Sequence, residues 1–168
     1  MKQLIYADNA ATTQLDIDAF EAMKPYLLGE YGNASQPYSF ARTAKKALKN
    51  SREIIAQCIG AQPEEIFFTS GGTESNNWAI KGIAFSDPVK HAFITSVIEH
   101  HAILRPCADI ERMGHPVSYL PVDYTGTVNI ETLAENINSD TRLVSVMTAN
   151  NEIGSIQDIS ALAAIAHS

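Results

Sequence analysis

The chain has 168 residues, of which 45% are hydrophobic and 18% are charged, and its formal net charge is −7. This acidity argues against nucleic acid as the main partner, because binding a phosphate backbone requires clustered lysine and arginine. No apolar stretch is long enough to span a bilayer and residues 1–8 lack a signal-peptide pattern, so we expect a cytoplasmic protein without a membrane partner.

The first third of the chain predicts two helices. The first runs from about Asp16, a good N-cap residue, to Leu28, and Gly29 stops it. A loop rich in Gly, Asn and Pro follows at residues 32–37. Apolar residues at helical spacing then predict a long helix over residues 38–59.

From Ile66 onward, short apolar runs alternate with helical patterns. The predicted strands cover residues 66–68, 92–97, 116–121 and 142–148, and the predicted helices cover residues 73–85, 101–113, 130–137 and 159–167. Strands separated by single helices imply crossover connections, so we expect an α/β fold whose mostly parallel sheet is flanked by helices. The last helix has no Gly, Asn or Pro to end it, and we expect the chain to be the first part of a larger domain.

The two cysteines, Cys58 and Cys107, form no CxxC pair, which suits a reducing compartment. Both lie in apolar surroundings and are expected to be small buried side chains. A zinc site made of His100, His101 and Cys107 matches no common ligand spacing, so no metal site is expected.

Three polar patches follow directly on predicted strands, at residues 69–76, 99–101 and 150–152. In an open parallel sheet, ligands bind outside the carboxyl ends of the strands. We therefore expect the patches to share one rim, with Thr73, His100 and Asn151 lining one pocket.

The patch at residues 70–73 joins a strand to a helix. Backbone N–H groups in the first turn of a helix are unpaired and favour an anion, and glycines let the backbone approach it closely. The absence of G-x-G-x-x-G and of Gly-Lys-Ser/Thr favours a phosphate monoester over a dinucleotide or a triphosphate. The alternative is a tight turn with a helix cap and no ligand.

His100 and Asn151 are the other candidate ligand-binding residues. An imidazole can stack on a planar ligand or exchange protons near neutral pH, although a histidine here could instead cap a helix or make a core hydrogen bond. Asn151 can donate a hydrogen bond to a ring hydroxyl or a substrate carboxylate, or serve only as a turn residue.

Five segments together, residues 6–13, 32–35, 68–76, 98–100 and 150–154, resemble the class V aminotransferase group of pyridoxal-phosphate enzymes, most closely the cysteine desulfurases. The resemblance implies the partial large domain of a fold type I pyridoxal-phosphate enzyme. Residues 1–14 would form an extended segment, and residues 15–168 the first part of the large cofactor-binding domain.

The resemblance also implies roles for individual residues. Gly72 and Thr73 would hold the phosphate of pyridoxal 5′-phosphate. His100 would stack on the pyridine ring and take part in proton transfer as a catalytic residue, and Asn151 would contact both the cofactor and the substrate carboxylate. The family's Schiff-base lysine lies in a Ser/Gly-x-His-Lys segment that this sequence does not contain, so the chain alone is expected to be inactive.

The full-length parent implied by the resemblance converts L-cysteine to L-alanine and moves the sulfur to an enzyme cysteine. It would supply a sulfur-acceptor protein for iron–sulfur cluster or thio-cofactor assembly, as a homodimer. The alternatives are a selenocysteine lyase or small-amino-acid aminotransferase of the same group, or a non-catalytic protein that binds a phosphate-bearing ligand.

Overall fold

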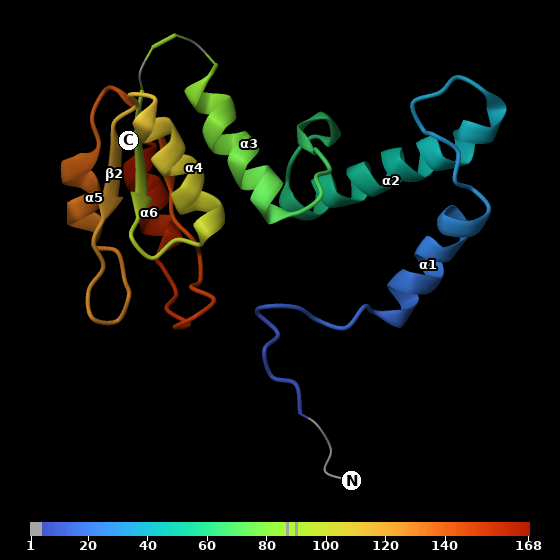
Figure 1. Ribbon diagram of the computed structural model, residues 1–168, viewed down its shortest axis with the longest axis horizontal. Coiled ribbons are helices and arrows are strands. Elements are labelled where there is room, and N and C mark those ends of the chain that lie inside the picture. The colour runs from blue at the N-terminus through green and yellow to red at the C-terminus, as the bar shows by residue number, and fades with distance from the viewer. Residues whose placement is uncertain (1–4, 87, 90) are drawn as a thin grey trace. The chain divides into compact units, whose positions relative to one another are not determined.

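The computed structural model describes residues 5–86, 88–89 and 91–168. It divides into two compact units, Met1–Phe68 and Thr69–Ser168 (Figure 1). No helix within the described residues is both long and apolar enough to cross a membrane. The two units differ in how much of their apolar surface is buried.

The first unit is built from two helices, as the sequence predicts. α1 (Ile17–Leu28) begins where the Asp16 carboxylate accepts the N–H groups of Asp18 and Ala19, and the Gly29 N–H closes its last turn. α2 (Arg42–Ile59) ends at Gly60, whose φ of 69° only glycine adopts readily. Two short 3₁₀ turns, η1 (Ser39–Ala41) and η2 (Pro63–Glu65), flank α2, so the expected helix over residues 38–59 starts as a 3₁₀ turn.

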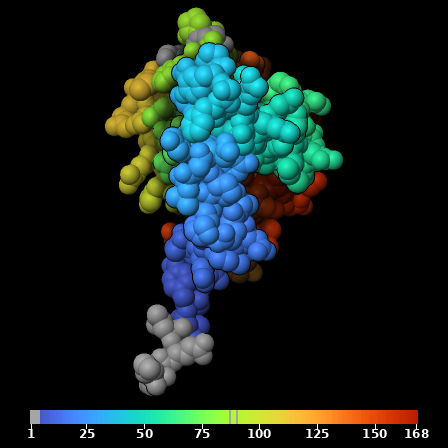
Figure 2. Space-filling model, turned by 90° about the vertical axis from the view of Figure 1, so that its right-hand side faces the viewer, coloured from blue at the N-terminus to red at the C-terminus, as the bar shows by residue number. Residues whose placement is uncertain are grey.

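Most apolar side chains of this unit are exposed. α1 has no buried residue, and Ala41 and Ala56 are the buried residues within the described part of the unit. Figure 2 shows the side chains of α1 and α2, in blue to cyan, open on the face turned to the viewer. A groove of about 690 Å³ lies between the two helices, with Met23 and Tyr26 on one side and Leu48 and Ile54 on the other.

The predicted strand over residues 66–68 is wrong. These residues form no strand, and the Ile66 carbonyl accepts a hydrogen bond from Arg52 Nε at 3.0 Å. The Arg52 guanidinium also lies over the Phe68 ring, 5.1 Å from its centroid. A strand must share its backbone hydrogen bonds with a neighbouring strand, and the described residues provide no such neighbour here.

The second unit carries a three-stranded parallel sheet, which confirms the expected fold class. Its strands are β1 (Ala92–Ser96), β2 (Val117–Leu120) and β3 (Thr141–Ser145), in the order β2-β1-β3. Its helices are α3 (Gly72–Ala84), α4 (His101–Arg112), α5 (Ile130–Asn136) and α6 (Ile159–Ala166). Each expected element from residue 73 onward is present, with strands one or two residues shorter than expected.

Alternate residues of β1 supply the two halves of the core. Phe93 packs in a cluster with Ile80 of α3 and Ile110 of α4. The next residue, Ile94, packs in a second cluster with Leu133 of α5 and Leu162 of α6. Because successive strand side chains point to opposite faces, the sheet is covered by helices on both sides.

The two cysteines differ in their surroundings. Cys107 is buried at 2% exposure, as expected, and burial raises the pKa of its thiol to about 11. Cys58 is exposed on α2, so the expectation that it is buried is wrong. Helical periodicity places a residue on a face, but it does not show whether anything covers that face.

Candidate functional site

A pocket of about 350 Å³ lies beyond the carboxyl ends of β1 and β3. Its lining comes from residues 97–101, Leu104 and residues 150–153. The chain passes from β1 to β2 on one side and returns to β3 on the other side of β1. The crevice between β1 and β3 is therefore the point where strand order reverses, the usual ligand position in open α/β sheets.

The structure brings together two of the three residues expected to line one pocket. His100 and Asn151 both line it, and Thr73 does not belong to its lining. Thr73 lies in the first turn of α3, which packs beside α4. Figure 1 shows that both helices begin at the same end of the unit, the end where the loops after β1 and β3 lie.

His100 is held by its place at the start of α4. Its Nδ1 accepts the backbone N–H of Ala102 at 3.0 Å, so the alternative that this histidine caps a helix is confirmed. An accepting Nδ1 carries no proton, which leaves the proton of the neutral ring on Nε2. Capping uses a nitrogen in the ring plane and not a ring face, and the exposed His100 ring lies 6.3 Å from the His101 ring, centroid to centroid, at an interplanar angle of 53°.

The two adjacent asparagines have different tasks. Asn150 is 9% exposed, and its Nδ2 donates to the Ile98 carbonyl at 2.9 Å. Its Oδ1 accepts the N–H groups of Glu152 and Ile153, at 2.8 and 3.0 Å. Asn151 is exposed and lines the pocket, so it is the amide that can reach a ligand.

Glu99 is a site residue that the sequence reasoning did not single out. It is 6% exposed, lines the pocket, and its Oε1 accepts Ser96 Oγ at 2.9 Å and the Met147 N–H at 2.7 Å. Burial raises the pKa of this carboxyl, and the hydrogen bonds from Met147 and Ser96 offset only part of that rise. The available signal was an acidic residue directly after a buried strand and before a candidate histidine.

The start of α3 fits a phosphate group in part. A Cβ added at Gly71 or Gly72 would meet nothing within 4 Å, so open space lies beside the first turn of a 13-residue helix. The N–H groups of that turn favour an anion. However, the Glu74 carboxylate accepts both the N–H and the hydroxyl of Ser70, at 2.7 and 2.6 Å, so the Ser70 hydroxyl is already engaged.

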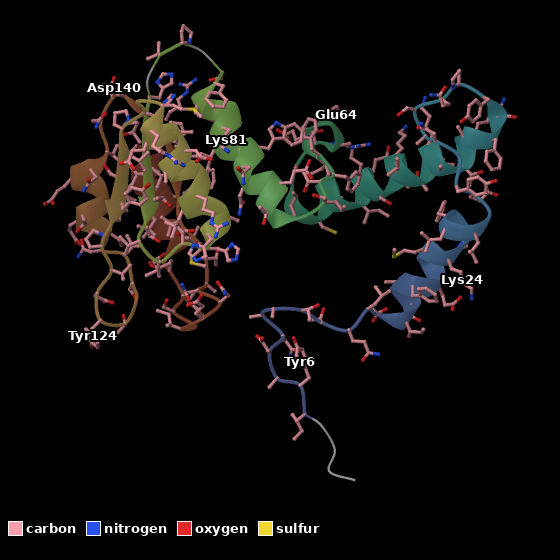
Figure 3. The ribbon with its side chains drawn as sticks, in the orientation of Figure 1. Tyr6, Lys24, Glu64, Lys81, Tyr124 and Asp140 are labelled. Carbon is pink, nitrogen blue, oxygen red and sulfur yellow. The ribbon has the colours of Figure 1, made fainter. Side chains whose placement is uncertain are left out.

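Several lysines of the described residues are engaged in ion pairs. Lys81 of α3 contacts Asp109 of α4 at 2.9 Å, and Figure 3 labels this lysine. Lys24 pairs with Glu21 at 3.1 Å.

Within the part of the chain that the structure describes, no group of three or more His, Cys, Asp or Glu side chains could hold a metal ion.

Residues 5–168 match the family model described as aminotransferase class V. A cysteine desulfurase IscS of Dictyoglomus turgidum is 51% identical over 168 residues, which cover 99% of this chain and 42% of that protein. Among solved structures, a NifS-like protein matches with a TM-score of 0.91 and 39% identity, over 94% of this chain and 44% of that one. The structure titled SspA in complex with cysteine has a TM-score of 0.92 and 39% identity, over 96% and 47%. The chain therefore spans less than half the length of these relatives.

Proposed function

The chain belongs to the class V aminotransferase family, and from this premise we propose that it is the N-terminal part of a pyridoxal-phosphate-dependent cysteine desulfurase. The observation that carries the proposal is the pocket in which His100 and Asn151 meet at the point where strand order reverses. The similarity to a cysteine desulfurase and to a protein solved with cysteine supports the choice of substrate.

We propose that the full-length parent converts L-cysteine to L-alanine and passes the sulfur to an enzyme cysteine. A sulfur-acceptor protein would then carry it toward iron–sulfur cluster or thio-cofactor assembly, in the cytoplasm, with the parent acting as a homodimer. Residues 1–14, of which residues 1–4 lie outside the described part of the chain, would be an extended segment, and residues 15–168 would be the first part of the large cofactor-binding domain.

Each proposed site residue has a task that its surroundings support. The N–H groups of Gly72 and Thr73 would hold the cofactor phosphate at the open start of α3. His100 would stack on the pyridine ring and exchange a proton through Nε2, because Nδ1 is engaged with Ala102. Asn151 would donate its amide to the cofactor and to the substrate carboxylate. When bound, pyridoxal phosphate supplies the electron sink for the carbon–sulfur chemistry.

A titration of the ¹⁵N-labelled chain with pyridoxal 5′-phosphate tests this assignment. We expect amide signals at residues 72–73, 98–101 and 150–153 to shift together. His100→Ala and Asn151→Ala should weaken binding, whereas the control His167→Ala, which removes an exposed imidazole outside this pocket, should not. Shifts confined to other parts of the chain, or equal effects of the three variants, would refute the proposed site.

Activity is tested separately. We expect the 168-residue chain to release no more sulfide from L-cysteine than free pyridoxal phosphate does, because the lysine that binds the cofactor covalently is expected outside this chain. Sulfide release above that of free cofactor, in a preparation free of other desulfurases, would contradict this expectation.

A further inference from the structure

Side-chain hydrogen bonds connect the loop after β1 to the loop after β3. They lie beyond the last backbone pair of the two strands. The backbone pairing of β1 with β3 ends at Thr95 and Ser145. Among the described residues, the hydrogen bonds that connect residues 97–101 to residues 146–153 all involve Glu99 or Asn150. Two side chains therefore continue the connection that the sheet begins.

These two links are reciprocal. Glu99, from the loop after β1, accepts the N–H of Met147 in the loop after β3 at 2.7 Å. Asn150, from the loop after β3, donates to the carbonyl of Ile98 in the loop after β1 at 2.9 Å. Each loop thus supplies one buried side chain and one backbone group to the other loop.

Each linking residue directly precedes an exposed residue of the pocket. Glu99 is 6% exposed and is followed by His100, and Asn150 is 9% exposed and is followed by Asn151. Hydrogen bonds in such buried surroundings are costly to break, because the partners left behind cannot pair with water. The hydrogen bonds of Glu99 and Asn150 therefore restrict the movement of the pocket-lining side chains that follow them, His100 and Asn151.

We propose that Glu99 and Asn150 are positioning residues, which lock the two loops together so that His100 and Asn151 face a ligand at a fixed separation. This inference rests on the proposed function for the identity of the ligand. The locking itself belongs to the ligand-free chain and can be measured without any ligand.

The chemistry of Glu99 allows a sharp pair of variants. Both of its hydrogen bonds are accepted by the same oxygen, Oε1. Glu99→Gln keeps one carbonyl oxygen and can keep both bonds, whereas Glu99→Leu removes both. In the same way, Asn150→Asp keeps the Oδ1 that accepts from Glu152 and Ile153 but loses the donor to Ile98.

Thr95→Val is the matched control. Thr95 is buried in β1, and its hydroxyl donates to the Ser145 carbonyl of β3 at 2.9 Å. The control therefore removes one buried hydrogen bond between the same two strands, but inside the sheet and not between the loops. A variant that acts only by lowering stability should behave as this control does.

The experiment measures two quantities on the full 168-residue chain. The first is the hydrogen-exchange rate of the Met147 amide, together with the ¹⁵N shift of His100 Nδ1, without ligand. The second is the affinity for pyridoxal 5′-phosphate. Glu99→Leu should speed the exchange and weaken binding, each by about tenfold, the effect of losing the one hydrogen bond of Glu99 that joins the two loops, the bond to Met147. Asn150→Asp should weaken binding to a similar extent, while Glu99→Gln and Thr95→Val should stay within about twofold of the unaltered chain.

The outcomes distinguish a positioning role of Glu99 and Asn150 from a general loss of stability. Unchanged exchange and His100 shift in Glu99→Leu would overturn the proposal, and so would an equal loss of binding in Thr95→Val. If Glu99→Leu does not fold, Asn150→Asp decides, by the His100 shift and the affinity. If the unaltered chain binds no pyridoxal phosphate, the proposed function fails, and the ligand-free measurements alone support or refute the locking.

Discussion

Gln157 provides the most direct energetic test of how the second unit is held together. Its Oε1 accepts the N–H of Val128 at 2.8 Å and its Nε2 donates to the Gly126 carbonyl at 2.6 Å. All three residues are buried, and Gln157 itself is 4% exposed. One side chain therefore satisfies two buried backbone groups of a distant turn.

Replacing Gln157 by methionine keeps the length of the side chain and removes both bonds. An unpaired buried backbone group costs about 1–3 kcal/mol, so we expect Gln157→Met to lower the free energy of unfolding by about 2–4 kcal/mol, allowing for some relaxation of the turn. Amide hydrogen exchange at Ile94 and Leu133, both in the core of this unit, reports that free energy.

A second variant, at the same position, separates the acceptor role of Gln157 from its donor role. Gln157→Glu keeps the acceptor for Val128 and, when ionised, has no donor for Gly126. Protonation restores a donor, so its loss of stability should shrink as the pH falls through the pKa of the introduced carboxyl. A loss below about 0.5 kcal/mol in Gln157→Met, the size expected for an unimportant surface change, would refute this account of the turn.

Three further outcomes are expected. Gly126→Ala and Gly114→Ala should each destabilise the second unit by about 1 kcal/mol, because both glycines have positive φ and the Ile153 Cδ1 that an added Cβ would meet at Gly126 ends an exposed side chain that can move aside; denaturant unfolding of both variants measures this, and a much larger loss in Gly126→Ala would contradict it. Iodoacetamide at about pH 8 should modify exposed Cys58 and spare Cys107, whose pKa burial raises to about 11, and mass spectrometry would show equal labelling if this is wrong. Burial raises the pKa of Glu99 in the folded chain, so its contribution to stability is present at low pH and lost as the pH rises through that pKa. Glu99→Gln should therefore gain stability relative to the unaltered chain as the pH rises above 4.5, the ordinary pKa of this carboxyl, and a constant difference in unfolding free energy would contradict this.

Local chemistry was sufficient to predict most elements. Asp16 and Gly29 define both ends of α1, and Gly60 ends α2, because caps act through neighbouring backbone groups. From residue 92 onward, short apolar runs alternate with helical patterns. This alternation predicts a parallel sheet, because strands separated by single helices imply crossover connections. The prediction of a strand over residues 66–68 was wrong because a strand needs a neighbouring strand to pair with, and an apolar run in the sequence does not show whether such a neighbour exists.

The site was predictable only where position alone decides it. His100 and Asn151 follow strands, and the order of strands in a parallel sheet brings them to one pocket. The sequence could not show that Asn150 links the loops and that Asn151 lines the pocket, because the two side chains are chemically identical and differ only in burial. Glu99 was missed because its partners, Ser96 and Met147, include a backbone group 48 residues away.

The exposure of α1 has a thermodynamic consequence for anything that binds it. A helix of 12 residues is marginal in water by itself, and α1 gains no stabilisation from buried side chains of its own. A molecule that covers α1 would therefore also shift its helix–coil equilibrium. Part of the contact energy would be spent on ordering the helix, so the measured affinity would understate the strength of the contacts and would rise with any substitution that favours the helix beforehand.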